Sequence, residues 1–138
     1  MSEASLKPER IAVIDDDTVF LELMHDLLGL GEGYQVFSSA DSLGCVEFIE
    51  RVSADLVILD LMLGGQDTGW TVLDLLRSHP STRELPVIVC SAATPALEAK
   101  APQLQALGHV SCISKPFDLE QLVATVERML AWSRAAIA

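Results

Sequence analysis

The residues that could do chemistry come in four groups, and each group directly follows a short apolar run of the sequence. The groups are Asp15, Asp16 and Asp17; Asp60; Ser91; and Lys115. Asp60 is the most unusual, because it interrupts the apolar stretch LVILDLML (56–63). An ionised acid within a buried segment is costly unless it reaches solvent, a cation or a hydrogen-bond donor. Asp60 therefore either caps a turn at a strand end or does chemistry there.

The residue types in the four groups fit a metal-assisted phosphoryl site. Several carboxylates close together repel one another unless a cation lies among them. Oxygen ligands with some water suit Mg²⁺, and a compact ammonium such as that of Lys115 suits a phosphoryl group. Asp60 is the candidate nucleophile, since it stands alone after its strand. The alternative for Asp15 to Asp17 is a helix N-cap cluster, and we expect Asp17 to cap the helix that begins near Thr18.

Five short runs rich in β-branched residues are predicted to be the strands that position these groups. Most of them do not alternate with polar residues, as expected of strands covered on both faces. The predicted strands span 10–14, 34–38, 56–59, 86–90 and 110–114.

Stretches with helical spacing lie between and after the strands. Their predicted buried stripes are Val19, Phe20, Leu23, Leu27 and Leu28; Cys45, Val46, Ile49 and Val52; Val72, Leu73, Leu75 and Leu76; and Leu119, Leu122, Val123, Val126, Met129 and Leu130. Residues 95–107 form a weaker predicted helix, because Pro102 should break or kink it. We expect Asp118 to cap the last helix.

The alternation of strand and helix predicts an α/β fold with a doubly wound parallel sheet of five strands and helices on both faces. In such open sheets, functional groups gather beyond the carboxyl ends of the strands. All four chemical groups follow predicted strands, so we expect them to converge on that edge.

Length and composition indicate a single domain and argue against several classes of protein. A chain of 138 residues fits one domain, and its formal charge of −11 argues against direct nucleic-acid binding. No apolar run approaches the roughly 20 residues needed to cross a bilayer, and the first residues lack the apolar core of a signal peptide. Three cysteines (Cys45, Cys90 and Cys112) form no CxxC pair and are interpreted as buried, reduced thiols of a cytoplasmic protein.

The motifs IAVIDDD, LVILDLML, VIVCSAA and SKPF, in this order, resemble the receiver domain of two-component response regulators. The resemblance covers the chain from about Arg10 to Trp132. It implies a flavodoxin-like sheet with strand order 2-1-3-4-5, flanked by five helices. It also implies an N-terminal extension (1–9), a receiver domain (10–132) and a C-terminal tail (133–138).

The resemblance also implies a role for each motif residue. Asp60 would accept a phosphoryl group from a phosphohistidine, and the domain would lose it slowly by self-dephosphorylation. Mg²⁺, or Mn²⁺ in its place, would bind Asp16, Asp60 and the backbone carbonyl of Met62, with Asp15 acting through a metal-bound water. The remaining assignments are Ser91 and Lys115 on phosphoryl oxygens, and Pro116 after a cis peptide that aims the lysine.

Two positions depart from the family pattern. Gly64 stands where receivers commonly carry proline, in a loop that is one residue longer than usual. Cys112 stands where receivers usually carry Tyr or Phe, a ring that turns inward together with the Ser/Thr on activation. Cys112 has no such ring, so we expect no inward-turning aromatic residue at this position.

Several readings of the function follow from the resemblance. We expect a stand-alone receiver that contacts a sensor histidine kinase and a downstream protein target. A module of a longer regulator or hybrid kinase, or a relay intermediate that passes phosphate to a histidine phosphotransfer protein, would have the same motifs. A phosphatase of the haloacid dehalogenase type would have its nucleophile in a DxD arrangement after the first strand and a bulky substrate cap, and we find no segment for such a cap. A binding-only pseudo-receiver would usually lack one of the acids or the lysine.

Overall fold

A computed structural model describes residues 8–41, 43–63, 68–92 and 95–137 of the protein. Its centre is a parallel sheet with strand order β2-β1-β3-β4-β5, which confirms the expected topology. The strands are β1 (Arg10–Ile14), β2 (Gln35–Ser39), β3 (Leu56–Leu59), β4 (Val87–Ala92) and β5 (Val110–Lys115). Each predicted strand is found, with ends that differ from the prediction by at most two residues.

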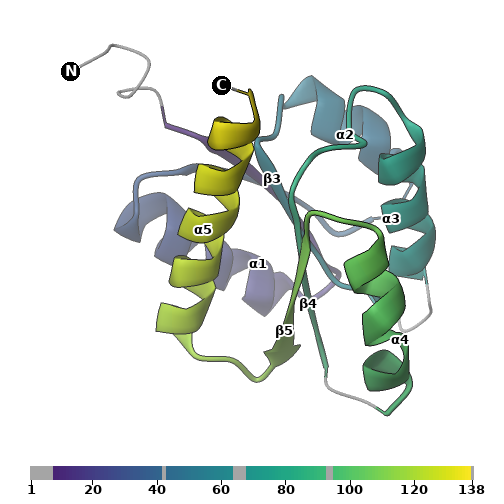
Figure 1. The fold of residues 1–138 in the computed structure, drawn as a ribbon. Coiled ribbons are helices and arrows are strands. Elements are labelled where there is room, and N and C mark those ends of the chain that lie inside the picture. The colour runs from purple at the N-terminus through teal and green to yellow at the C-terminus, as the bar shows by residue number, and fades with distance from the viewer. Residues whose placement is uncertain (1–7, 42, 64–67, 93–94, 138) are drawn as a thin grey trace.

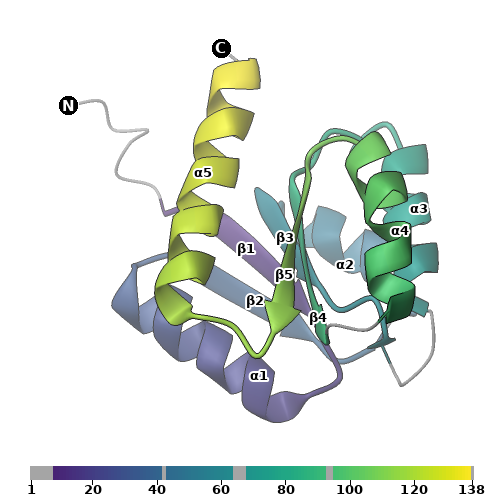
Figure 2. The same cartoon turned by 60° about the horizontal axis from the view of Figure 1, so that its bottom comes forward.

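Helices cover both faces of the sheet, as the alternating pattern predicted (Figures 1 and 2). The first helix is α-helical and then continues as a π-helical turn, so the two parts are α1 and η2. On one face lie α1, η2 and α5, and on the other lie α2, α3 and α4. The bounds are α1 (Thr18–Met24), η2 (His25–Gly31), α2 (Cys45–Arg51), α3 (Thr68–Ser78), α4 (Pro95–Ala106) and α5 (Leu119–Ile137).

The sheet divides the apolar core into two clusters, one under each helical layer. Successive side chains of β1 point to opposite faces. Ile11 and Val13 therefore join the cluster under α1 and α5, whereas Ala12 and Ile14 join the cluster under α2, α3 and α4. All four are completely buried. Burial on both faces explains why this strand reads as a continuous apolar run.

The buried face of the first helix is rotated from the prediction. Val19 is 71% exposed and Leu23 is 36% exposed, whereas Leu21 and Met24 are buried. Apolar residues occupy both candidate faces, so spacing alone could not select one. Leu75 and Leu119, also predicted as buried, are likewise exposed.

Pro102 does not break α4, so the predicted break is wrong: the helix runs from Pro95 to Ala106 with Pro102 inside it. A proline removes one backbone donor and leaves the carbonyl four residues earlier, that of Glu98, without its helical partner. Pro102 and Glu98 are both exposed, so water can satisfy that carbonyl and the helix can continue.

The cysteine prediction is confirmed for two residues and wrong for the third. Burial raises the pKa of the Cys45 thiol to about 11 and that of Cys90 to about 12. Cys112 is exposed. It lies on β5, the strand at the edge of the sheet, where no further strand continues the layer. The sequence around Cys112 is apolar, but edge position, not local composition, decides its exposure.

Within the described ranges, no helix combines the length and the apolar character that crossing a membrane requires.

Candidate functional site at the carboxyl edge of the sheet

The pairing of β1 with β3 places Asp15 beside Asp60. Ile14 and Leu59 are partners in the parallel register, so the next residue of each strand leaves the sheet at the same level. The Asp60 amide donates to the Ile14 carbonyl at 3.1 Å, and the Asp15 amide donates to the Ser39 carbonyl at 3.1 Å. Both aspartates are therefore held by the sheet's own backbone bonds.

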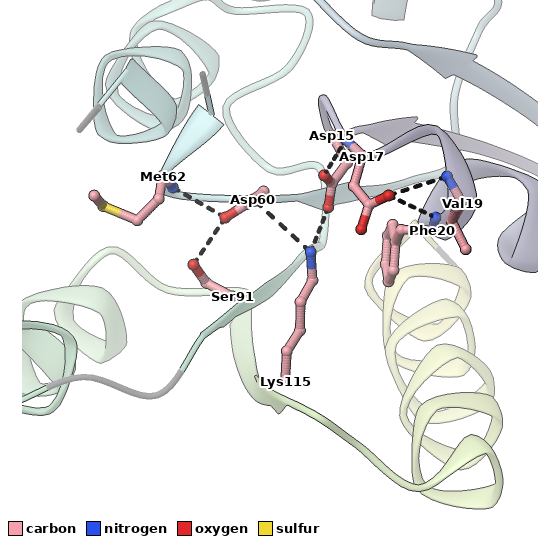
Figure 3. Close-up of polar contacts among 8 residues, drawn as sticks. All are labelled: Asp15, Asp17, Val19, Phe20, Asp60, Met62, Ser91 and Lys115. Atoms are coloured by element: carbon pink, nitrogen blue, oxygen red, sulfur yellow. Dashed lines mark hydrogen bonds and ion pairs between the residues drawn. The ribbon is translucent and has the colours of Figure 1, made fainter. Parts of the chain in front are cut away.

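The Asp60 carboxylate is oriented by two donors. Its Oδ1 accepts hydrogen bonds from the Met62 amide at 3.0 Å and from the Ser91 hydroxyl at 2.8 Å. Its Oδ2 lies 3.7 Å from the Lys115 ammonium (Figure 3). The side chain is only 12% exposed, so the carboxylate is fixed at the edge of the core but still reaches solvent.

Lys115 joins Asp60 to the acids that follow β1. Its ammonium lies 2.7 Å from Asp15 Oδ2, and Asp15 Oδ1 accepts a bond from the Asp17 amide at 2.9 Å. Asp15 is thus buried, with both of its oxygens engaged. The peptide between Lys115 and Pro116 is cis, as expected. Asp17 accepts from the amides of Val19 and Phe20 and is the N-cap of α1, also as expected.

The residues at this edge suit a divalent cation. One carboxylate oxygen each from Asp15, Asp16 and Asp60 can be chosen so that all three lie within 4.8 Å of one another. Lys115 pairs with two of these acids, Asp15 and Asp60, so in this part of the described chain the three carboxylates carry more charge than the lysine can balance. A hard cation with oxygen ligands and some waters, such as Mg²⁺, would balance this excess. The donor set therefore fits the metal that the motifs imply.

Burial and the neighbouring charges shift the pKa values of Asp15 and Lys115. Burial raises the pKa of Asp15, and the hydrogen bonds from Lys115 and the Asp17 amide offset this only in part. Burial alone would lower the pKa of Lys115, but its hydrogen bond to Asp15 and the charges of Asp15 and Asp60 outweigh it, so the pKa is raised. Both groups therefore hold their protons more tightly than usual.

The raised pKa of Asp15 predicts a pH-dependent stability. Between the ordinary value of 3.8 and its raised value, folded Asp15 binds more protons than unfolded Asp15. Its contribution to the free energy of unfolding therefore falls as pH rises through that window. Asp15→Asn lacks this titration, so the stability of the wild type relative to this variant should decline from acid to neutral pH. Urea unfolding in EDTA at stepped pH values measures the difference. If the free energy of unfolding of the wild type increases relative to that of Asp15→Asn as pH rises, the raised pKa of Asp15 is contradicted.

Sequence reasoning missed two residues at this site. Gly69, in the first turn of α3, is buried and its amide donates to the Leu61 carbonyl at 3.0 Å. Its position just before the helical stripe predicted from Val72 gave no signal of this contact. Phe20 was assigned to the core alone, yet the Lys115 ammonium lies 4.2 Å from its ring centroid. Gly64 and the longer loop around it fall outside the described residues.

Comparisons with known proteins agree with this arrangement. The family model described as "response regulator receiver domain" matches residues 11–127. The chain is 32% identical to a DNA-binding dual master transcriptional regulator of Synechocystis sp., RpaA, over 88% of this chain and 48% of that protein. It is 31% identical to the response regulator PleD of Caulobacter vibrioides, over 87% of this chain and 26% of that protein. The chain thus spans about half and about a quarter of these relatives.

A solved structure shows the same fold. The receiver domain of NtrX from Brucella abortus is 29% identical, with a TM-score of 0.75, and the match covers 88% of this chain and 98% of that one.

Proposed function

The chain belongs to the response regulator receiver domain family, and we propose that its Asp60 accepts a phosphoryl group from a phosphohistidine. The donor would be a sensor histidine kinase or a histidine phosphotransfer protein. The observation that carries the proposal is the orientation of the Asp60 carboxylate. One oxygen is held by the Met62 amide and the Ser91 hydroxyl, and the other faces the Lys115 ammonium.

The chemistry asked of the protein is positioning and charge neutralisation, as in phosphoryl transfer generally. An Asp60 oxygen forms the new bond to phosphorus while the bond from phosphorus to the donor's imidazole nitrogen breaks, and the imidazole takes up a proton. Lys115 is near enough to Asp60 to pair with a phosphoryl oxygen. Ser91 can transfer its hydrogen bond from Asp60 to another phosphoryl oxygen.

Asp16 and Asp60, with the Met62 carbonyl, are the residues we propose to hold Mg²⁺, or Mn²⁺ in its place. When bound, the metal supplies positive charge against the phosphoryl oxygens and the acids. Asp15, which is buried and paired with Lys115 at 2.7 Å, would act through a metal-bound water.

To transmit a signal, the protein must make some contacts in only one of its two states, phosphorylated or unphosphorylated. Ser91 is buried and bonded to Asp60, so its hydroxyl would report the phosphorylated state by moving. Cys112 is exposed and has no ring, so we propose that it does not take the part of an inward-turning aromatic residue. The partner that recognises the phosphorylated state would be a downstream protein. Alternatively, a histidine phosphotransfer protein would accept the phosphoryl group from Asp60.

Labelling by a small phosphodonor tests the proposal. With acetyl phosphate and Mg²⁺, the protein should incorporate one phosphoryl group per chain, and EDTA should prevent this. The reason is that the uncompensated acids would repel the donor when no cation neutralises them. Intact-protein mass spectrometry measures the incorporation. Equal labelling with and without EDTA would contradict a metal-dependent site.

The same assay distinguishes the two acids that follow β1. Asp16→Ala should raise the Mg²⁺ concentration for half-maximal labelling more than Asp15→Ala does, because a direct ligand costs more to lose than a contact through water. Asp74→Ala, at an exposed acid on α3, is a control for the loss of one negative charge. A larger effect of Asp15→Ala would reverse the assignment of the two acids.

A further inference from the structure

The Lys115 ammonium is enclosed by an aromatic ring as well as by two acids. It lies 2.7 Å from Asp15 Oδ2, 3.7 Å from Asp60 Oδ2 and 4.2 Å from the centroid of the Phe20 ring. A cation within about 6 Å of a ring centroid is attracted by the negative face of the ring. The lysine side chain is 23% exposed, so water screens this attraction only in part.

The ring itself is fixed by its surroundings. Phe20 is 6% exposed and belongs to the apolar cluster under α1 and α5. Its amide lies in the first turn of α1, where Asp17 accepts its hydrogen bond. Its ring also meets that of Phe117 edge to face, with centroids 6.0 Å apart. Packing therefore holds the Phe20 ring in place, and the ring would not move with the Lys115 side chain.

A lysine has a flexible four-carbon stem, and a strongly hydrated ammonium at its end has many positions open to it. Two acids on one side do not define its position, because they attract it without blocking its path away from them. A ring face limits the ammonium on another side without adding a charge. The combination holds the ammonium where it reaches Asp60 while leaving it free to exchange one oxygen partner for another.

We propose that Phe20 is a positioning residue of the phosphorylation site, whose ring face holds the Lys115 ammonium toward Asp60. Its effect on phosphotransfer rests on the proposed function. The contact between ring and ammonium does not, and it can be measured separately.

The first test reads the contact directly, without any phosphodonor. A ring face shifts the NMR signals of protons above it upfield, so the Lys115 ε-methylene protons should lie upfield of an ordinary lysine. Phe20→Leu should return them to the ordinary position, and Phe20→Tyr should keep them upfield. Phe48→Leu removes a ring on α2, in the cluster on the other face of the sheet, and should change nothing. Ordinary lysine shifts in the wild type would overturn the proposal.

The second test measures labelling of Asp60 by acetyl phosphate in saturating Mg²⁺. Phe20→Leu should slow labelling between about 2-fold and 30-fold, the range of a partly desolvated cation–π contact. Phe20→Tyr should restore the rate, whereas Phe48→Leu should leave it unchanged. Urea unfolding of each variant shows that the folded state is populated during the assay.

A double-variant comparison separates positioning from general packing. If Phe20 acts through the lysine, Phe20→Leu should have no further effect in a Lys115→Ala background. An equal slowing in both backgrounds would overturn the proposal, because the ring would then act by packing alone. A wild type that takes no label would instead be a failure of the proposed function, and the NMR result would still decide the contact.

Discussion

Asp60→Asn should take up no phosphoryl group from acetyl phosphate in Mg²⁺, under conditions that fully label the wild type. An amide oxygen is a poor nucleophile, so the expected loss is complete rather than partial. The variant should remain folded, because the asparagine oxygen can still accept the bonds that Asp60 Oδ1 takes from the Met62 amide and the Ser91 hydroxyl. The measurement is intact mass, combined with peptide mapping of the hydroxylamine-sensitive label.

The peptide map also identifies any other acceptor. Asp15 and Asp16 lie in the same cluster and are the alternative nucleophiles. Label on either of them in the Asp60→Asn variant would move the acceptor to the acids after β1, as in the phosphatase class that the family match disfavours. Asp74→Asn, at an exposed acid on α3, should label like the wild type.

Gly69→Ala should destabilise the fold and disturb the site together. A β-carbon at Gly69 would lie 2.3 Å from the Asp60 carbonyl oxygen and 2.4 Å from Leu61 Cα, so it would collide with backbone. Overpacking of this kind costs about 1–3 kcal/mol, although alanine in a helix is otherwise favoured over glycine by about 1 kcal/mol. Relief requires α3 to move away or the Asp60–Leu61 backbone to shift. The same shift would displace the Met62 carbonyl and the Asp60 carboxylate.

Urea unfolding and the labelling rate measure the two consequences. Gly29→Ala is the matched control, because its β-carbon would meet nothing closer than 3.7 Å. Gly29 lies within η2, so we expect Gly29→Ala to leave the free energy of unfolding unchanged or to raise it by up to about 1 kcal/mol, because alanine is favoured over glycine in a helix. If Gly69→Ala is as stable as this control and labels at the wild-type rate, the packing of α3 against the Asp60–Leu61 backbone does not affect the proposed phosphorylation site.

The sequence by itself determined the alternation of strands and helices, the parallel sheet covered on both faces, and the edge at which the site forms. Apolar runs that do not alternate indicated strands buried on both faces, and β1 has this burial. Polar residues directly after the strands indicated a shared edge, because parallel strands end on the same side of a sheet. Both features are local patterns in the chain, and they suffice to predict that Asp15, Asp60, Ser91 and Lys115 lie together.

The tertiary structure decided what depends on neighbours distant in the chain. The first helix carries apolar residues on two faces, and contact with the sheet selects the face of Phe20 and Met24 while leaving Val19 exposed. Cys112 is exposed because β5 is an edge strand, a property of strand order rather than of local sequence. The nearness of Phe20 to Lys115 has the same cause. Packing α1 and β5 at one edge brings a ring face and an ammonium to 4.2 Å, and neither residue alone predicts the other.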